Sequence, residues 1–365
     1  MFSDEQKYLV GLSHFPKFGP KRLKLLLEKF PGSAAAFHAP LADLVSSGLS
    51  ENLATEFIQF RQKIVLEKIL EKMSRENIGI ISLADKSYPR LLKEIFDPPI
   101  VLYYKGCLEN IDFNLAIVGS RKCTSYGRQC AESFAAELSR QGLNIVSGLA
   151  LGIDTYVHEA CLKNSGRTIA VLGSGIDNAS LYPAINHPLA ERIIQQGSLI
   201  FSEFPLGTEP LRYNFPQRNR IISGLSQATL VIEAQEKSGA LITARFALEQ
   251  NRELLAVPGN IFTPAAFGPN ELIKQGAKLI TKSDEVMEVF GLEPAKLQSF
   301  QENKKLLPSS REEEKLLPFI SKEPAHINEL VRLSGLDTAT INSTLTIMEM
   351  KGMVRNLGNM QYVIV

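Results

Sequence analysis

The sequence predicts an α/β protein centred on an extended Rossmann-like domain, a doubly wound and mostly parallel sheet. Short apolar runs alternate with longer helical patterns over residues 112–292, which is typical of repeated β-α units. Helical periodicity dominates residues 1–75, and residues 311–365 have the pattern of three helices and a β-hairpin. We therefore expect a small all-helical N-terminal domain and a C-terminal winged-helix domain around the sheet.

The expected helical domain, residues 1–75, contains a turn, Phe15–Leu23, that is similar to a helix-hairpin-helix turn. Such turns can hold a phosphate non-specifically through backbone amides. Lys17 stands where that pattern usually has its first glycine. A structural turn is therefore the preferred interpretation, and a contact with DNA stays open.

The expected Rossmann-like domain covers residues 76–292. Residues 78–106 have the pattern strand, helix and strand, and form a bridge that can extend the sheet. The core strands are expected at residues 115–118, 144–146, 168–172, 198–201, 229–232, 253–257 and 278–280. Because ligands of such sheets bind outside the carboxyl ends of the strands, we expect a site in the loops that follow these runs.

Residues 293–310 are polar and aperiodic, which indicates a linker. In the expected winged-helix domain, residues 311–365, helices are predicted at 311–320, 327–333 and 337–350, and a hairpin at 353–356 and 361–364. The third helix contains no Lys or Arg. Since a helix without cations reads a DNA groove poorly, the sequence favours a protein-contact or regulatory role for this domain.

Composition excludes several classes of function. The 365 residues include 40 Lys and Arg against 39 Asp and Glu, so any nucleic-acid site must be a local patch. The four cysteines match neither a zinc pattern nor a redox pair, and no metal or other cofactor is expected. Free thiols, the lack of a signal-peptide pattern and the lack of a membrane-length apolar run favour a cytoplasmic protein without a membrane partner.

The segment from Arg212 to Arg220 is the most informative. It combines arginines, aromatic rings and asparagines, which supply phosphate charges, stacking faces and base-edge hydrogen bonds. We expect this segment to be a loop that runs into a helix at 221–225. Only an unpaired base can stack on a ring, so single-stranded DNA is favoured over duplex. The alternative is a solvated arginine-rich loop with Phe215 in the core.

Two turns of small residues precede predicted helices, Gly119–Lys122 and Lys237–Thr243. Such turns present backbone amides and the positive end of a helix dipole, which suit a phosphate. Neither is a dinucleotide fingerprint or a Walker loop, and many such turns only cap a helix. Gly148 flanks another turn, which is followed by Asp154 and His158 four residues apart. Without a third ligand, a structural hydrogen bond is preferred there over a metal site.

Catalytic motifs are absent from the sequence. There is no nucleophile elbow, no zinc-protease motif and no carboxylate pair with an assignable role. We therefore expect a protein that is not an enzyme and has no catalytic residues. Glu203, Glu233 and Glu249, near strand ends or on a loop-proximal helix, keep a hydrolase alternative open.

These motifs, in this order, resemble the DNA-processing protein A family, also called DprA or Smf. The matching segments are Tyr88–Pro89, Gly119–Arg121, Ser147–Asp154, Phe215–Ser226, Ser238–Arg245 and Val257–Gly259. The flanking domains also fit the three-part arrangement of many members, so the resemblance covers nearly the whole chain.

The resemblance implies a homodimer that binds single-stranded DNA, protects it after uptake during natural transformation and helps to load the RecA recombinase. It implies that Arg121 contacts phosphate, and that Arg212 and Phe215 grip the backbone and stack on a base. It further implies a pocket floor built by three residues, Arg218, Asn219 and Arg220. Ala184 stands where members often carry Lys or Arg, so one phosphate contact is expected to be missing.

Two alternatives stay open beside this hypothesis. The first is a nucleotide phosphoribohydrolase on a related fold, although its doubled glycine is lost in Ser238–Thr243. The second is a scaffold that recruits a recombinase without touching DNA. The residues expected to bind DNA are Gly119, Ser120, Arg121, Lys122, Gly148, Arg212, Phe215, Arg218, Asn219, Arg220, Ser238, Gly239, Thr243 and Arg245.

Overall fold

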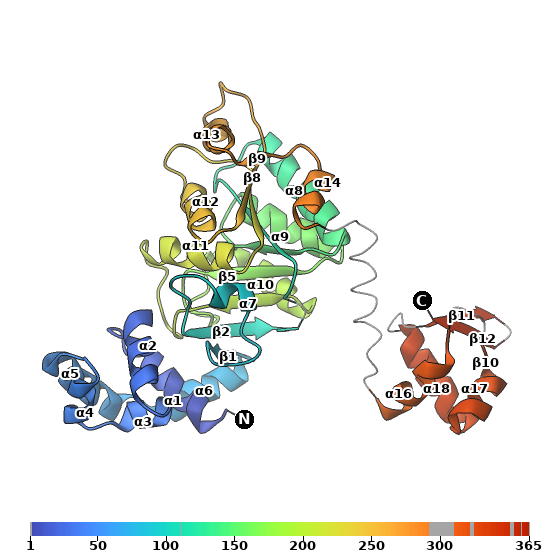
Figure 1. Cartoon of the computed structure of the whole chain (residues 1–365), viewed down its shortest axis with the longest axis horizontal. Coiled ribbons are helices and arrows are strands. Elements are labelled where there is room, and N and C mark those ends of the chain that lie inside the picture. The colour runs from blue at the N-terminus through green and yellow to red at the C-terminus, as the bar shows by residue number, and fades with distance from the viewer. Residues whose placement is uncertain are drawn as a thin grey trace. The chain divides into compact units, whose positions relative to one another are not determined.

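The computed structural model describes residues 2–109, 111–291, 310–321, 325–350, 354–358 and 360–364. They divide into two compact units, Met1–Gly291 and Leu292–Val365, which Figure 1 distinguishes by colour along the chain. The first unit contains both the expected helical domain and the expected Rossmann-like domain, and their separation into two domains stays a prediction. The expected linker, residues 293–310, lies outside the described residues except for Ser310.

The first unit begins with helices, as the periodicity predicts. They are α1 Asp4–Ser13, α2 Pro20–Lys29, α3 Ser33–His38, α4 Leu41–Ser46, α5 Glu51–Lys63 and α6 Leu66–Arg75. Ser3 caps α1 by accepting a hydrogen bond from the Gln6 amide, and Pro20 stands in the first turn of α2. Both residue types suit a helix start. The serine hydroxyl accepts a hydrogen bond from an amide that has no partner within the helix, and proline has no amide hydrogen that would need a partner.

A nine-stranded sheet follows, with the strand order β1-β2-β6-β5-β4-β3-β7-β8-β9. The strands are β1 Gly79–Ser82, β2 Val101–Gly106, β3 Asn114–Val118, β4 Asn144–Ser147, β5 Thr168–Leu172, β6 Leu199–Ser202, β7 Ala228–Val231, β8 Glu253–Ala256 and β9 Lys278–Leu279. β1 pairs with β2, and β2 with β6, in antiparallel fashion, while the pairs from β6 to β9 are parallel. The bridge of residues 78–106 thus extends the sheet, and the predicted doubly wound, mostly parallel sheet is confirmed.

The remaining α-helices of the first unit lie between successive strands, except for α14, which follows β9. They are α7 Arg90–Lys93, α8 Ser125–Arg140, α9 Ile153–Lys163, α10 His187–Gln195, α11 Asn214–Gly224, α12 Gly239–Glu249, α13 Phe267–Lys274 and α14 Ser283–Val289. After β3, the chain adds β4, β5 and β6 one after another on one side of β3, and it then adds β7 and β8 on the other side. The strand order therefore reverses next to β3, the position at which doubly wound sheets bind ligands.

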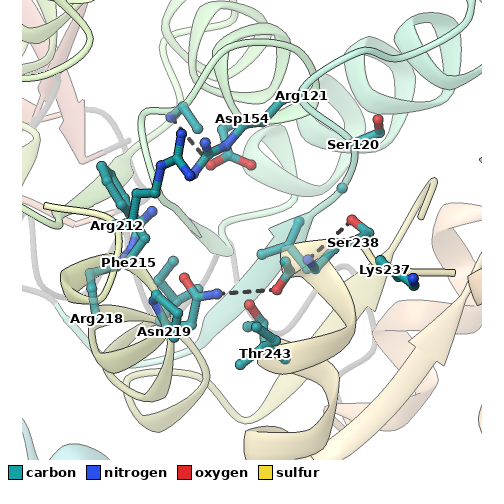
Figure 2. A pocket seen from close by; sticks show the side chains of 18 of the residues that line it. Ser120, Arg121, Asp154, Arg212, Phe215, Arg218, Asn219, Lys237, Ser238 and Thr243 are labelled. Carbon is teal, nitrogen blue, oxygen red and sulfur yellow. Dashed lines mark hydrogen bonds between the residues drawn. The ribbon is translucent and has the colours of Figure 1, made fainter. Parts of the chain in front are cut away.

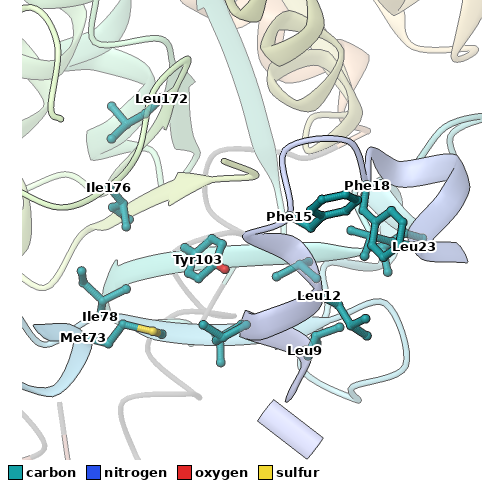
Figure 3. Close-up of a cluster of buried hydrophobic side chains, with 14 of the residues drawn as sticks. Leu9, Leu12, Phe15, Phe18, Leu23, Met73, Ile78, Tyr103, Leu172 and Ile176 are labelled. Atoms are coloured by element: carbon teal, nitrogen blue, oxygen red, sulfur yellow. The ribbon is translucent and has the colours of Figure 1, made fainter. Parts of the chain in front are cut away.

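The sheet has a hydrophobic core on each face, which is why its strands are continuous apolar runs rather than alternating ones. Within β5, Ala170 and Leu172 belong to one cluster, while Ile169 and Val171 belong to the other. The first cluster also contains side chains of the N-terminal helices, such as Leu9 and Leu12, as Figure 3 shows. The N-terminal helices therefore pack on the sheet and share its core.

The second unit is a winged helix, as predicted. Its elements are α16 Arg311–Leu316, a short helical turn at Leu317–Phe319, β10 Ala325–His326, α17 Ile327–Ser334, α18 Thr338–Met350, β11 Val354–Gly358 and β12 Gln361–Ile364. The strands form an antiparallel sheet in the order β10-β12-β11. Gly335 ends α17 with a φ of 69°, a left-handed conformation that glycine adopts at low cost. The first helix stops at Leu316, before Pro318, which lacks the amide hydrogen that an α-helix needs.

Candidate nucleic-acid interface

A pocket of about 930 Å³ opens at the carboxyl ends of the parallel strands, where the strand order reverses. It is lined by the turn after β3, by residues around α11 and by the start of α12, as Figure 2 shows. The sequence-predicted residues that line it are Gly119, Ser120, Arg121, Lys122, Arg212, Phe215, Arg218, Asn219, Ser238, Gly239 and Thr243. Tertiary structure thus brings together three segments that are far apart in the sequence.

The turn after β3 carries two exposed cations, Arg121 and Lys122. The Ser120 hydroxyl fixes the turn, because it accepts from the Lys122 amide at 3.1 Å and donates to the Lys122 carbonyl at 2.9 Å. A Cβ on Gly119 would lie 2.6 Å from Ile153 of α9. Glycine is therefore required for α9 to approach this turn.

Phe215 lies half-buried in the pocket with other side chains around its ring. The Arg121 guanidinium lies over the ring at 5.1 Å from its centroid, a cation–π geometry. The Tyr182 ring is 5.9 Å away and tilted by 59°. One face of Phe215 is therefore already covered by a guanidinium, and a base that stacks there must replace Arg121 or join it.

Arg218 is part of the floor and is only 3% exposed. Its Nη1 donates to the carbonyl of Gly148 at 2.7 Å and to that of Val171. Burial lowers the pKa of Arg218 to about 10, although the facing Asp154 opposes the shift. Asp154 in turn accepts hydrogen bonds from the amides of Gly148 and Ala150. Arg218 therefore ties the ends of β4 and β5 together beneath the pocket.

Gly148 does not line the pocket, although the sequence predicted it in the site. A Cβ at this position would lie 2.2 Å from Nη1 of Arg218. Glycine at this position therefore leaves room for the buried guanidinium of Arg218. Gly148 acts through Arg218 and not through a contact with the ligand.

Arg220 also lies outside the pocket lining. Its guanidinium forms two hydrogen bonds with the carboxylate of Glu203, at 2.9 and 2.7 Å, and both side chains are buried. Burial raises the pKa of Glu203, and the charge of Arg220 opposes this rise. Arg220 is therefore held by an internal ion pair and is not available to a ligand in the pocket.

The placement of these arginines follows from the start of α11. We expected a loop as far as residue 220, but the helix begins at Asn214, since Pro216 is tolerated within a first helical turn. Residues three or four apart share a helix face, so Phe215, Arg218 and Ile222 line the pocket. Arg220 falls on another face of the same helix.

The start of α12 faces the pocket from the other side. Ser238 caps the helix by accepting from the Ala240 amide at 3.3 Å, and Asn219 donates to the Gly239 carbonyl at 3.1 Å. Thr243 lines the pocket one turn later. Arg245 does not, because it points to solvent and pairs with Glu249 at 2.8 Å. The first turn of α12 thus offers amide donors suited to an anion.

Several lining residues were not among the residues that the sequence predicted to bind DNA. They are Val118, Ala150, Asp154, Tyr182, Pro210, Pro216, Ile222, Gln235, Lys237, Ala240 and Ile242. Lys237, the first residue of the predicted turn Lys237–Thr243, adds a fourth exposed cation beside Arg121, Lys122 and Arg212. Among the lining residues that the structure describes, Asp154 is the one carboxylate, and its charge is directed at amides and Arg218. The pocket is therefore a positive patch on a nearly neutral chain.

The carboxylates that kept a hydrolase open have structural partners outside the pocket. Glu203 pairs with Arg220, and Glu249 with Arg245. Glu233 accepts hydrogen bonds from the amide and hydroxyl of Thr124, at 2.9 and 2.5 Å. None of these carboxylates lines the pocket in the described part of the chain.

The other predicted features have structural explanations. His158 Nδ1 is 2.7 Å from the Thr168 hydroxyl, and the described residues contain no group of three or more side chains that could hold a metal. In the turn similar to a helix-hairpin-helix, Phe15 and Phe18 are buried and Lys17 pairs with Glu56. Among the helices that the structure describes, none is long and apolar enough to span a bilayer.

The match to known families covers most of the chain. The family described as DNA recombination-mediator protein A matches residues 67–291, and the DprA winged helix domain matches residues 301–360. Protein Smf of Synechocystis is 35% identical over 400 residues, covering 99% of both chains. Protein Smf of Escherichia coli is 43% identical over 258 residues, covering 70% of this chain and 68% of that one.

Solved structures agree with these matches. The crystal structure of DNA processing protein A from Streptococcus pneumoniae superimposes with a TM-score of 0.67 at 35% identity, covering 79% of this chain and 98% of that one. The protein from Helicobacter pylori, whose structure is described for its single-stranded DNA binding mode, gives 0.53 at 30% identity and covers 60% and 97%. The chain belongs to the DNA recombination-mediator protein A family, also called DprA or Smf.

Proposed function

We propose that this protein binds single-stranded DNA in the pocket beside β3, protects it and helps to load the RecA recombinase during DNA processing in natural transformation. The observation that carries the proposal is the lining of the pocket. Four exposed cations, Arg121, Lys122, Arg212 and Lys237, line the same pocket as the half-buried ring of Phe215. Family membership and the binding mode named for the Helicobacter pylori relative support the same chemistry.

Each part of this lining suits one part of a DNA strand. The cations and the first-turn amides of α12 suit phosphates, whose condensed counterions are released on binding. Phe215 suits a base, but its ring lies inside the pocket rather than on the outer surface. Only an unpaired base can leave its stack and reach such a ring, so duplex should bind more weakly.

The test is a titration of labelled oligo-dT and of duplex at several salt concentrations. We expect tighter binding of the single strand, and a slope of log K against log salt of about −0.7 per phosphate contacted. Arg121→Ala and Arg212→Ala should each reduce the magnitude of the slope by about 0.7. Arg245→Ala is the matched control, because Arg245 is exposed but lies outside the pocket. If both pocket variants bind like the wild type, the scaffold alternative is favoured.

We further propose that the protein is not an enzyme. The carboxylates nearest the strand ends are engaged by Arg220, Thr124 and Arg245 rather than directed into the pocket. Incubation with nucleoside monophosphates should therefore release no free base. Base release that is lost with a carboxylate variant such as Glu233→Gln would favour the phosphoribohydrolase alternative.

We also propose a homodimer. In the loop after β8, Ile261 and Phe262 are 80% and 87% exposed, and large apolar side chains in such positions are typical of protein interfaces. Light scattering should give twice the chain mass for the wild type and a lower mass for Phe262→Asp.

The proposed RecA loading has a separate test. RecA filament formation on oligo-dT is measured with and without the protein.

A further inference from the structure

The last two turns of α6 contact the loops that form one wall of the pocket. Lys72 Nζ lies 2.5 Å from Oδ2 of Asp177, in the loop after β5, residues 173–183. Glu76, which ends α6, accepts a hydrogen bond from the Asn178 amide at 2.8 Å. Two neighbouring residues of that loop are therefore held by one helix of the N-terminal region.

Asp177 connects α6 to a second loop as well. Its side chain is completely buried, and its other oxygen, Oδ1, accepts from the Gly207 amide at 2.9 Å. Gly207 belongs to the loop after β6, residues 203–213. The two loops also pair directly, because the Gly175 amide donates to the Thr208 carbonyl at 2.9 Å. One carboxylate thus joins α6, the loop after β5 and the loop after β6.

The charge of Asp177 is maintained by these partners. Burial by itself would raise the pKa of Asp177, but the hydrogen bonds from Lys72 and the Gly207 amide lower the pKa below its ordinary value. The carboxylate is therefore ionised at neutral pH. Removal of the Lys72 charge would take away the cation that contacts this buried anion, which destabilises the arrangement in which the two loops are held.

Further contacts make this junction rigid. Lys105 of β2 is 5% exposed and donates to Asn178 Oδ1 at 2.8 Å and to Glu76 at 3.3 Å. Beside the polar contacts, Met73 of α6 and Ile176 of the loop after β5 belong to one buried cluster, as Figure 3 shows. Polar and apolar contacts therefore act at the same place.

The same loops supply the wall of the pocket on their other side. Tyr182 belongs to the loop after β5, and Pro210 and Arg212 belong to the loop after β6. The Tyr182 ring also packs on Phe215. Lys72 itself does not line the pocket, so its effect on a ligand there must pass through these loops.

We propose that the Lys72–Asp177 ion pair is a positioning element through which the N-terminal helical region sets the affinity of the pocket for single-stranded DNA. It holds Arg212 and Tyr182 where phosphate and base bind. This inference rests on the proposed function, and it assigns the helical region a role that needs no DNA contact of its own.

The first test uses the free protein. In Lys72→Met, amide hydrogens of residues 203–213 should exchange faster than in the wild type, because local opening of the loop becomes easier. Lys7→Met is the matched control: it breaks the Lys7–Glu67 ion pair between α1 and α6, which touches neither loop. Lys72→Arg keeps the charge and should restore protection. Unchanged exchange in a folded Lys72→Met protein would overturn the inference.

The second test measures oligo-dT binding of the same variants. Lys72→Met should lose about tenfold in affinity, as expected for one misplaced charge-assisted contact, whereas Lys7→Met should bind like the wild type. In an Arg212→Ala background, Lys72→Met should have little further effect, because the contact that it positions is already absent.

A failure of this inference and a failure of the proposed function would give different results. Fully multiplicative effects of Lys72→Met and Arg212→Ala would mean that Lys72 does not act through Arg212, and would overturn the inference while leaving the proposed function intact. A wild-type protein that does not retain oligo-dT would overturn the proposed function, and the inference with it.

Discussion

Two regions of this chain have folds that suit nucleic-acid binding, but their side chains differ. In the first unit, the pocket beside β3 is lined by exposed cations and by Phe215. In the second unit, α18 occupies the position of a winged-helix recognition helix but contains no Lys or Arg. Its exposed positions are Thr338, Ala339, Asn342, Ser343, Thr346, Ile347 and Glu349. Affinity for phosphate follows the charges that a fold displays, and the fold class alone does not supply it.

The same contrast exists among the arginines at and just before α11. Arg212, just before the helix, is exposed at the pocket, whereas Arg218 is a buried part of the floor and Arg220 is buried with Glu203. Arginines that are neighbours in the sequence therefore have different roles. One is free for a ligand and the other two stabilise the structure that holds it.

The largest expected effect concerns the buried side of this contrast. Arg218→Ala should lower the free energy of unfolding by about 3 kcal/mol, because Asp154 loses its facing charge and two carbonyl groups lose their donor. Arg332→Ala, at an exposed position of α17, should change it by less than about 0.5 kcal/mol. Urea denaturation measures both. Equal stabilities would show that Arg218 is not a structural residue.

The next effect concerns the stacking face. Phe215→Ala should weaken oligo-dT binding by about 1–3 kcal/mol, with an unchanged salt slope, because the ring carries no charge. Phe96→Ala is the control, since Phe96 is 99% exposed and does not line the pocket. A loss of slope in Phe215→Ala would indicate that the ring acts mainly by holding Arg121.

A third effect concerns the pH dependence of stability. Burial lowers the pKa of His158 to about 3, and the charge of Arg218 adds to the shift. Between this pKa and the ordinary value of 6.5, the unfolded chain binds a proton that the folded chain does not. The stability that His158 contributes is therefore complete above pH 6.5 and falls with pH, by about 1.4 kcal/mol per unit at most.

Unfolding measured from pH 7 to pH 4 tests this dependence. His158→Gln should lose the part of the slope that corresponds to one proton, while the exposed His38→Gln should keep the full slope. If the free energy of unfolding of His158→Gln depended on pH in the same way as that of the wild type, another group would be the one that takes up the proton.

The smallest effect is expected at α18. Ile347→Glu changes an exposed residue of that helix and removes no cation, so oligo-dT affinity should stay within about twofold of the wild type. Fluorescence anisotropy measures this. A large loss would mean that the second unit contacts the strand, and that the contrast between the two regions is wrong.

Local sequence patterns were sufficient for most of the fold. Apolar runs marked the parallel strands, because both faces of the sheet are covered and the central positions of strands such as β3 and β5 are apolar. The small residues of Gly119–Lys122 and the turn before α12 marked loops that line the pocket. The start of α11 was placed too late, because Asn214, Pro216 and Asn219 have low helix propensity.

The sequence by itself determined the fold class, the winged helix and the segments that surround the pocket, since these depend on local periodicity and turn chemistry. Only the tertiary structure decided which cations are free. Arg220 is engaged because Glu203 lies beside it in the fold, and Lys72 reaches Asp177 across 105 positions of the chain. An ionisable side chain is available to a ligand only if it does not already form an ion pair with a buried partner. Such partners lie in distant segments of the sequence, so no local pattern reveals them.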